Sequence, residues 1–166
     1  MPNTLEPPAT LLLEQFAPFR LNRLADAVSI NLSEIYRDRF GLEISEWRVL
    51  VTVGQRKECT AQQIALSTRM HKTRVSRAVT AMEGRNLLAR RANAEDGREM
   101  TLILTTAGQR MYCALVPLAL TRERDLLSCL SAAERKAFLG AITKLEGALD
   151  LHESESRLPD GPLRGG

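Results

Sequence analysis

Two short β-prone segments lie in the middle of a chain whose other periodic segments are helical, and they limit the folds available to it. The segments LLARRA (87–92) and MTLILT (100–105) flank a charged stretch that contains the dipeptide Asp96-Gly97. An Asp-Gly pair between two β-prone segments is typical of a tight hairpin turn. The pattern therefore predicts one hairpin in a mainly helical domain. Its charged tip is either an ordinary solvated turn or a contact site for a charged partner.

A long helix is predicted near the start of the chain. Residues 1–10 contain three prolines and no periodicity, so we expect a flexible arm there. Residues 11–40 carry apolar side chains at helical spacing, and Gly41 is placed to end the helix in a left-handed conformation. Pro18 marks either a kink or the true start of this helix. The apolar face consists of Leu21, Leu24, Val28, Leu32 and Ile35.

Three short helices are predicted before the hairpin. The first has the sequence SEWRVLVTVG (45–54). The second opens at Thr60, which is followed three residues later by Gln63, as in a capping box. The third begins near His71 or Lys72 and runs out at residues 84–86. Its apolar face consists of Val75, Val79 and Met82.

Two long helices are predicted after the hairpin. One follows Gly108, and Pro117 is expected to bend it. The other opens at a second capping box, formed by Ser131 and Glu134. The apolar residues of the two helices are Met111, Leu115, Leu118 and Leu126, and then Phe138, Ile142, Leu145 and Leu149. Residues 152–166 resemble a disordered tail, so the predicted fold class is mainly α with a small β-hairpin wing.

Length and composition favour a single soluble domain. The chain has 166 residues, of which 44% are hydrophobic and 26% are charged. The N-terminus has no basic region followed by an apolar core, and the apolar stretch 115–120 is too short to span a bilayer. We therefore expect a cytoplasmic protein that does not engage a membrane.

The polar residues of the sequence do not suggest catalysis or a metal site. The two histidines lie far apart, and the three cysteines, Cys59, Cys113 and Cys129, include no CxxC pair. A Ser/His/Asp arrangement, a Gly-rich phosphate loop and a carboxylate pair are also lacking. We expect no cofactor, no metal and no enzymatic activity.

Positive charge is concentrated in the middle of the chain. Residues 55–100 contain ten Lys and Arg residues against five acidic residues, a net charge of +5, whereas the rest of the chain carries −2. Such a concentration indicates a surface that binds a polyanion, although charge alone does not separate DNA from a membrane or an acidic protein.

The second and third short helices are predicted to form a helix-turn-helix. The helix near Lys72 has a basic start, and one such helix fits the major groove of DNA. Lys72 suits a phosphate, because a helix N-terminus also attracts anions. The residues free to meet DNA are Thr73, Arg74, Ser76 and Arg77. The alternative is that this helix simply carries a solvated face.

A hairpin that follows a helix-turn-helix is placed to act as a wing. We expect Arg98 to enter a neighbouring minor groove, where negative potential is concentrated, and Asp96 to orient its guanidinium. Arg90 and Arg91 on the first strand are expected near phosphates. The alternative is a surface turn with a weak ion pair and no ligand.

The stretch EDGREMTLILTTAGQ resembles the wing signature of MarR-family transcription regulators. The stretches SEWRVL and KTRVSRAVTAMEGRNLLARR are similar to the family's second helix and recognition helix, and the resemblance covers about 11–151. Two departures, His71 and Gly97, affect a helix cap and the charge of the wing tip. The residues that match the wing pattern are Asp96, Arg98, Leu102, Leu104, Thr105 and Gly108.

The resemblance implies a two-fold homodimer bound to double-stranded DNA. Residues 11–40 and 106–151 would supply the dimerisation helices, and 41–105 the winged helix-turn-helix lobe. The apolar stripe of the last helix also favours a dimer, since a single copy would leave it partly exposed. The competing account is that this stripe belongs to the core of one chain. A dimer would place its recognition helices about 34 Å apart, to match a pseudo-palindromic operator.

The resemblance further implies a small-molecule effector, often an aromatic acid, bound between the dimerisation helices and the DNA-binding lobe. Arginines beside aromatic residues would suit such an acid or an acyl-CoA thioester. The candidate residues are Phe16, Phe19, Arg20, Arg23, Trp47, Met70 and Tyr112. The plainer interpretation is that these aromatics belong to the core and these arginines to the surface.

The function predicted from the sequence is therefore a ligand-responsive DNA-binding repressor. One alternative is a repressor that senses oxidants through Cys59, whose acidity Lys57 would raise, while Cys113 and Cys129 pack against other helices. Another is a winged-helix module for protein assembly, whose basic face docks an acidic partner. A steep salt dependence of binding to a short duplex would separate DNA recognition from assembly.

Overall fold

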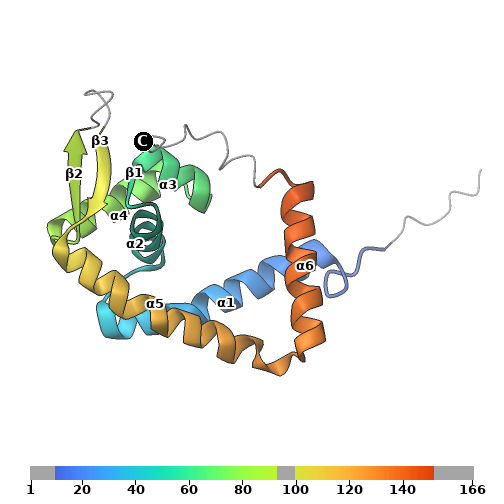
Figure 1. The fold of residues 1–166 in the computed structure, drawn as a ribbon. Coiled ribbons are helices and arrows are strands. Elements are labelled where there is room, and N and C mark those ends of the chain that lie inside the picture. Colours follow the sequence, from blue (N-terminus) through green and yellow to red (C-terminus); the bar gives the residue numbers. More distant parts are fainter. Residues whose placement is uncertain (1–9, 93–99, 152–166) are drawn as a thin grey trace, which may run out of the picture.

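The computed structural model describes residues 10–92 and 100–151, and it has the helical architecture with a small sheet that the sequence predicts (Figure 1). Four helices and a short strand precede the hairpin, and three helical elements follow it. In chain order the elements are α1 (Ala17–Phe40), α2 (Ile44–Arg56), β1 (Glu58–Thr60), α3 (Ala61–Thr68), α4 (Lys72–Gly84), β2 (Leu88–Ala92), β3 (Met100–Leu104), α5 (Thr106–Leu126), the 3-10 helix η1 (Leu127–Cys129) and α6 (Ala132–Ala148).

Helix α1 begins later than the sequence predicts, and it ends at the predicted residue. It starts at Ala17 rather than at residue 11, because Pro18 occupies the first turn, where its missing N–H costs nothing. Gly41 follows the helix with φ of 59° and donates its N–H to the last turn. Since that left-handed conformation is accessible to glycine without strain, the helix ends here.

Capping boxes define the starts of three helices. The predicted pairs Thr60–Gln63 and Ser131–Glu134 both form, with backbone and side-chain hydrogen bonds in each direction. A third box, in which Glu43 caps α2 and pairs with Glu46, was not predicted from the sequence. Helix α2 consequently begins at Ile44 and continues two residues past Gly54, the predicted end.

The hairpin belongs to a three-stranded antiparallel sheet with the strand order β1-β3-β2. Strands β2 and β3 pair as predicted, with Leu88 opposite Leu104 and Ala92 opposite Met100. Strand β1, which has three residues and pairs Cys59 with Leu102, was not predicted from the sequence. A strand this short shows no alternation of apolar and polar residues, so only its partner β3 reveals it.

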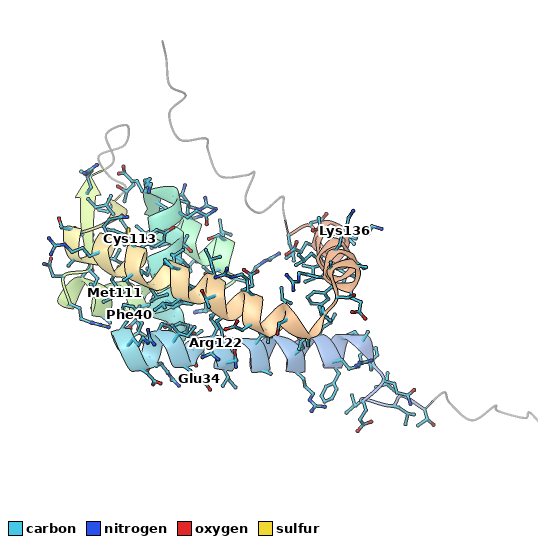
Figure 2. All side chains as sticks on the ribbon, turned by 60° about the horizontal axis from the view of Figure 1, so that its bottom comes forward. Glu34, Phe40, Met111, Cys113, Arg122 and Lys136 are labelled. Atoms are coloured by element: carbon cyan, nitrogen blue, oxygen red, sulfur yellow. The ribbon has the colours of Figure 1, made fainter. Side chains whose placement is uncertain are left out.

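Most of the hydrophobic core lies in the part of the chain from α2 to β3, and Tyr36 of α1, Leu42 and Leu115 of α5 belong to the same cluster. The apolar residues of α4 that the sequence places in the core, Val75, Val79 and Met82, are fully buried there. Helix α5 starts at Thr106, earlier than predicted, and extends alongside α1 away from the sheet (Figures 1 and 2). Only two residues of α5, Gly108 and Leu115, are buried.

Helix α6 contributes nothing to this core. It stands apart from the sheet and from α2 to α4 (Figure 1), and none of its residues is buried. In its predicted apolar stripe Phe138 and Ile142 are half-buried, whereas Leu145 and Leu149 are 49% and 67% exposed. The account that places this stripe in the core of one chain is therefore wrong. None of the helices in the described ranges has the length and apolar character needed to cross a membrane.

Candidate nucleic-acid interface

Helix α4 has one buried face and one exposed, cationic face. Val75, Ala78, Val79 and Met82 pack into the core because they recur at helical spacing. The opposite side of the first two turns is exposed to solvent along its whole length. The five predicted DNA-contact residues of this helix, Lys72, Thr73, Arg74, Ser76 and Arg77, are all on that exposed side.

The start of α4 is held in place by His71. Its side chain accepts a hydrogen bond from the backbone N–H of Thr73 at 3.3 Å and so satisfies one of the unpaired donors of the first turn. The backbone N–H groups of a helix start favour anions, and Lys72 adds a positive charge there. The start of α4 is thus suited to a phosphate group.

Helices α3 and α4 form a helix-turn-helix unit. Helix α3 ends at Thr68, and the next residue, Arg69, adopts a left-handed conformation with φ of 54°. Met70 then turns into the core, with 7% of its surface exposed, and α4 begins two residues later. Buried Ile64 of α3 belongs to the same core cluster as Val75 of α4, so the angle between the two helices is fixed by packing.

The cations of α4 are available to an external anion. Within the described ranges, Lys72, Arg74 and Arg77 have no ion pair with an acidic residue. Their charges are therefore not neutralised by carboxylates of those ranges, and the face is complementary to a polyanion.

The arginines of β2 lie in ion pairs instead. Arg90 donates two hydrogen bonds to Glu83 at the end of α4, at 2.8 and 3.2 Å, and this contact raises the pKa of its guanidinium. Arg91 lies 3.8 Å from Glu58 of β1, which also accepts a hydrogen bond from Thr101 of β3. Arg90 and Arg91 were predicted to lie near phosphates, and the sequence revealed neither carboxylate partner. The predicted tip residues, Asp96 and Arg98, lie outside the described residues.

A cleft of about 420 Å³ lies between α1, α2 and α5. Two of the predicted effector residues, Trp47 and Tyr112, line its largely apolar wall. Trp47 also stacks on Tyr36 of α1, with ring centroids 5.4 Å apart. The polar side chains of the cleft, all missed by sequence reasoning, are Asn31, Gln55, Arg122 and Glu123.

Comparisons with known proteins agree with this geometry. A MarR family model matches residues 40–99, which cover α2 to β2. The transcriptional regulator HosA of Escherichia coli O127:H6 is 29% identical over 86 residues, a match that spans 51% of this chain and 64% of HosA. A MarR/EmrR family regulator from Acinetobacter sp. ADP1 is 27% identical and superposes with a TM-score of 0.76, over 84% of this chain and 99% of that one. The chain matches the MarR family over residues 40–99 and shares the fold of a MarR/EmrR family regulator.

A more distant solved structure shares the fold alone. It is BpsR of Bordetella bronchiseptica, which is 20% identical and has a TM-score of 0.74, over 83% of this chain and 98% of its own. The DNA binding of BpsR is regulated by 6-hydroxynicotinic acid. The MarR family and its fold are those of transcriptional regulators, which are not enzymes.

The other predicted effector residues do not line the cleft. Phe19 is nine positions before Val28, the first residue of α1 that lines the cleft, or about 14 Å along the helix axis. The guanidinium of Arg23 lies over the ring of Phe19, 5.6 Å from its centroid. Phe16 and Arg20 are at the same end, and Met70 is in the core. Within one chain the seven predicted residues therefore occupy three separate places, because a long helix separates residues that a sequence pattern groups together.

The three cysteines differ from their predicted environments. Cys59 is buried, and desolvation raises its pKa to about 11, so the expected increase in acidity is wrong. The positive charge of Arg56 lowers this pKa, but its effect is smaller than that of desolvation. Cys113 and Cys129 were expected to pack against other helices but are exposed on α5 and η1 (Figure 2 labels Cys113).

Proposed function

We propose that this chain is a dimeric, sequence-specific DNA-binding regulator that acts as a repressor and is released from its operator by a small aromatic acid or its CoA thioester. The observation that carries the proposal is the exposed face of α4, on which Lys72, Arg74 and Arg77 have no described carboxylate partner. The match to the MarR family supports the same conclusion. This function requires the cytoplasmic location that we expect from the sequence.

In this proposal α4 is the recognition helix and enters the major groove. Arg74 and Arg77 are long enough to pair with guanine through two hydrogen bonds each. Thr73 and Ser76 bond base edges or phosphates, and Lys72 meets a phosphate at the helix start. Because the opposite face of α4 is buried in the core, the helix has one orientation in which it can enter the groove.

The wing extends this contact to the neighbouring minor groove. Arg98 enters that groove and Asp96 orients it. Arg90 and Arg91 reach phosphates by exchanging their carboxylate partners, Glu83 and Glu58, for phosphate oxygens. Such an exchange is feasible because exposed ion pairs contribute only about 0–1 kcal/mol.

Dimerisation through α1, α5 and α6 is supported by the apolar surface that these helices leave exposed. Leucine side chains on these helices, or directly after α6, have exposed fractions between 38% and 67%. They are Leu21, Leu24, Leu120, Leu126, Leu139, Leu145 and Leu149. Burying this surface against a second copy is favourable by about 25 cal/mol per Å². Two-fold symmetry would then place the two α4 helices about 34 Å apart.

The effector site in this proposal is the cleft between α1, α2 and α5. Trp47 and Tyr112 offer flat apolar surfaces for an aromatic ring. Arg122, 3.7 Å from Glu34 (Figure 2), offers a cation for a carboxylate. The cleft joins the helices proposed for dimerisation to α2 of the DNA-binding lobe, so a ligand there can change the distance between lobes. BpsR, whose DNA binding 6-hydroxynicotinic acid regulates, is a precedent within this fold.

The test is selection of operators from a pool of random duplexes, followed by binding measurements with the selected and scrambled sequences over a range of salt concentrations. We expect log K to fall by about 0.9 per log unit of salt for each phosphate neutralised. Arg74→Ala and Arg77→Ala should each cost about 1–3 kcal/mol at the selected site. Lys136→Ala on α6 (Figure 2), far from the α4 face, is the control and should bind like the parent. Equal affinity for selected and scrambled duplexes would reject the proposal and favour a protein-assembly module.

A further inference from the structure

Arg85, the residue that follows α4, joins the end of that helix to the end of α1. Its guanidinium donates one hydrogen bond to the carbonyl of Phe40 at 2.7 Å and another to the carbonyl of Gly41 at 2.8 Å. Figure 2 labels Phe40, at the end of α1. The residues joined are 44 and 45 positions apart in the chain. Arg85 is neither one of the proposed DNA-contact residues nor one of the residues that line the cleft.

The geometry at the end of α1 suits an arginine. The last carbonyls of a helix lack partners within the helix and carry partial negative charge. Arginine presents a planar fork of donors that reaches two carbonyls at once, whereas lysine offers a single charged nitrogen. Gly41 is favoured here by its left-handed φ of 59°, and a Cβ at this position would only touch the Arg85 Nη2 atom, at an ordinary contact distance of 3.9 Å.

A carboxylate of α2 forms an ion pair with the same guanidinium. Glu46 lies 3.5 Å from Arg85, and its side chain is only 12% exposed. The same carboxylate accepts a hydrogen bond from the Glu43 backbone at 3.0 Å, so it is held by the cap of α2. Arg85 therefore connects α1, α2 and α4 at one point, which we call the Arg85 junction.

The turn after Arg85 also fixes α4 to α5. The Thr105 hydroxyl donates to the carbonyl of Asn86 at 2.6 Å, and the Thr105 N–H donates to the carbonyl of Leu87 at 3.1 Å. Helices α1 and α4 do not pack along their lengths. Among the side-chain hydrogen bonds of the described residues, those of Arg85 alone link the end of α1 to the end of α4.

We infer that Arg85 is a positioning residue, which sets the placement of α4 relative to α1 and thereby the half-site spacing that the dimer accepts. The inference rests on the proposed function for its effect on DNA, but the placement of α4 is a property of the single chain. A dimer built on α1 transmits any change in this placement to the separation of its two recognition helices.

The first test measures the placement without DNA. Spin labels are attached at Asp26→Cys on α1 and Thr80→Cys on α4, both exposed positions, after Cys113→Ser and Cys129→Ser remove the exposed thiols. Labelled chains are diluted with unlabelled chains so that only distances within one chain are measured. We expect Arg85→Ala to widen the distance distribution at least twofold. An unchanged width would overturn the inference.

Arg37→Ala is the matched control for this measurement. Arg37 also lies at the end of α1 and pairs with Glu43 at 2.8 Å, and within the described ranges it has no hydrogen bond or ion pair to α4. Its removal deletes the same charge from the same region and should leave the width unchanged. If Arg85→Ala does not fold, Arg85→Lys replaces it. Lysine keeps the charge but cannot donate to both carbonyls in the geometry of the guanidinium, so the distance distribution should still widen. An unchanged width in Arg85→Lys would again overturn the inference.

The second test uses the selected operator with one or two base pairs inserted between its half-sites. We expect Arg85→Ala to reduce the preference for the correct spacing at least fivefold while binding an isolated half-site within twofold of the parent. An unchanged spacing preference would overturn the inference. If no operator sequence is selected but Arg85→Ala still widens the distance distribution, the proposed function is rejected. The inference that Arg85 sets the placement of α4 relative to α1 is then retained.

Discussion

The Nε atom of Arg90 lies 2.8 Å from a carboxylate oxygen of Glu83, so the first strand of the wing is bound to the end of α4. The contact has two consequences. It fixes the wing to the helix proposed to read the major groove. It also competes with DNA for a cation that the sequence assigned to phosphate contact, because the ion pair has to break before Arg90 can reach a phosphate.

Glu83→Gln is therefore expected to tighten DNA binding. The substitution removes a negative charge beside the proposed DNA face and frees Arg90 for a phosphate. We expect a gain of roughly 1 kcal/mol and a salt slope steeper by about 0.9, the value for one additional neutralised phosphate. Fluorescence anisotropy with the selected duplex measures both. Asp26→Asn removes an acid from α1 and should change neither. Weaker binding by Glu83→Gln would mean that the ion pair serves to orient the wing.

Gly54 is expected to tolerate no side chain, because a Cβ there would overlap the Tyr112 ring. Gly54→Ala should lower the free energy of unfolding by about 1–3 kcal/mol, the usual cost of overpacking. The control is Gly84→Ala, where no atom lies within 4 Å of the added Cβ, and it should raise stability by up to about 1 kcal/mol. Urea denaturation compares the two, and equal effects would show that the Tyr112 contact is unimportant.

Burial of Cys59 is expected to make stability fall at alkaline pH. Its pKa is about 11 in the folded chain against 9.0 in the unfolded chain, so the unfolded state loses its proton first. The stabilising contribution is complete below pH 9 and is lost as the pH rises from 9 to 11, by about 1–3 kcal/mol. Denaturation of the parent and of Cys59→Ala across this range isolates the effect, because other groups titrate equally in both. Parallel curves would contradict the burial.

Arg122 is expected to anchor an acidic effector in the cleft between α1, α2 and α5. A thermal-shift screen of aromatic acids and their CoA thioesters should give stabilising ligands, since a ligand that binds only the folded state raises the melting temperature. Arg122→Gln should reduce the shift produced by such an acid. Arg124→Gln, at a position that does not line this cleft, should retain it. Equal loss in both variants would place the acid elsewhere.

Short-range patterns in the sequence were reliable for this chain. The pairs Thr60–Gln63 and Ser131–Glu134 start helices as predicted, and Gly41 ends one. The division of α4 into a buried and an exposed face was also correct. Each of these features depends on residues within one or two turns of each other, so the interactions that produce them are visible in the local sequence.

Other features depend on which distant segments meet, and the sequence did not reveal them. Strand β1 exists because β3 lies beside it, and Arg90 is paired because Glu83 lies within reach. Lys57 near Cys59 suggested an acidic thiol, whereas burial in the core decided its pKa. The predicted effector residues were expected to form one site, but in the folded chain they lie at the cleft, in the core and at the start of α1.

The sequence by itself determined the order of the helices and the hairpin, two of the three capping boxes and the cationic face of α4, because these follow from periodicity and local hydrogen bonding. The tertiary structure alone decided which arginines are paired, where the cleft lies and how α4 is fixed to α1. Arg85 illustrates the difference: its partners are 44 and 45 residues away, and only folding brings their carbonyls within hydrogen-bond distance.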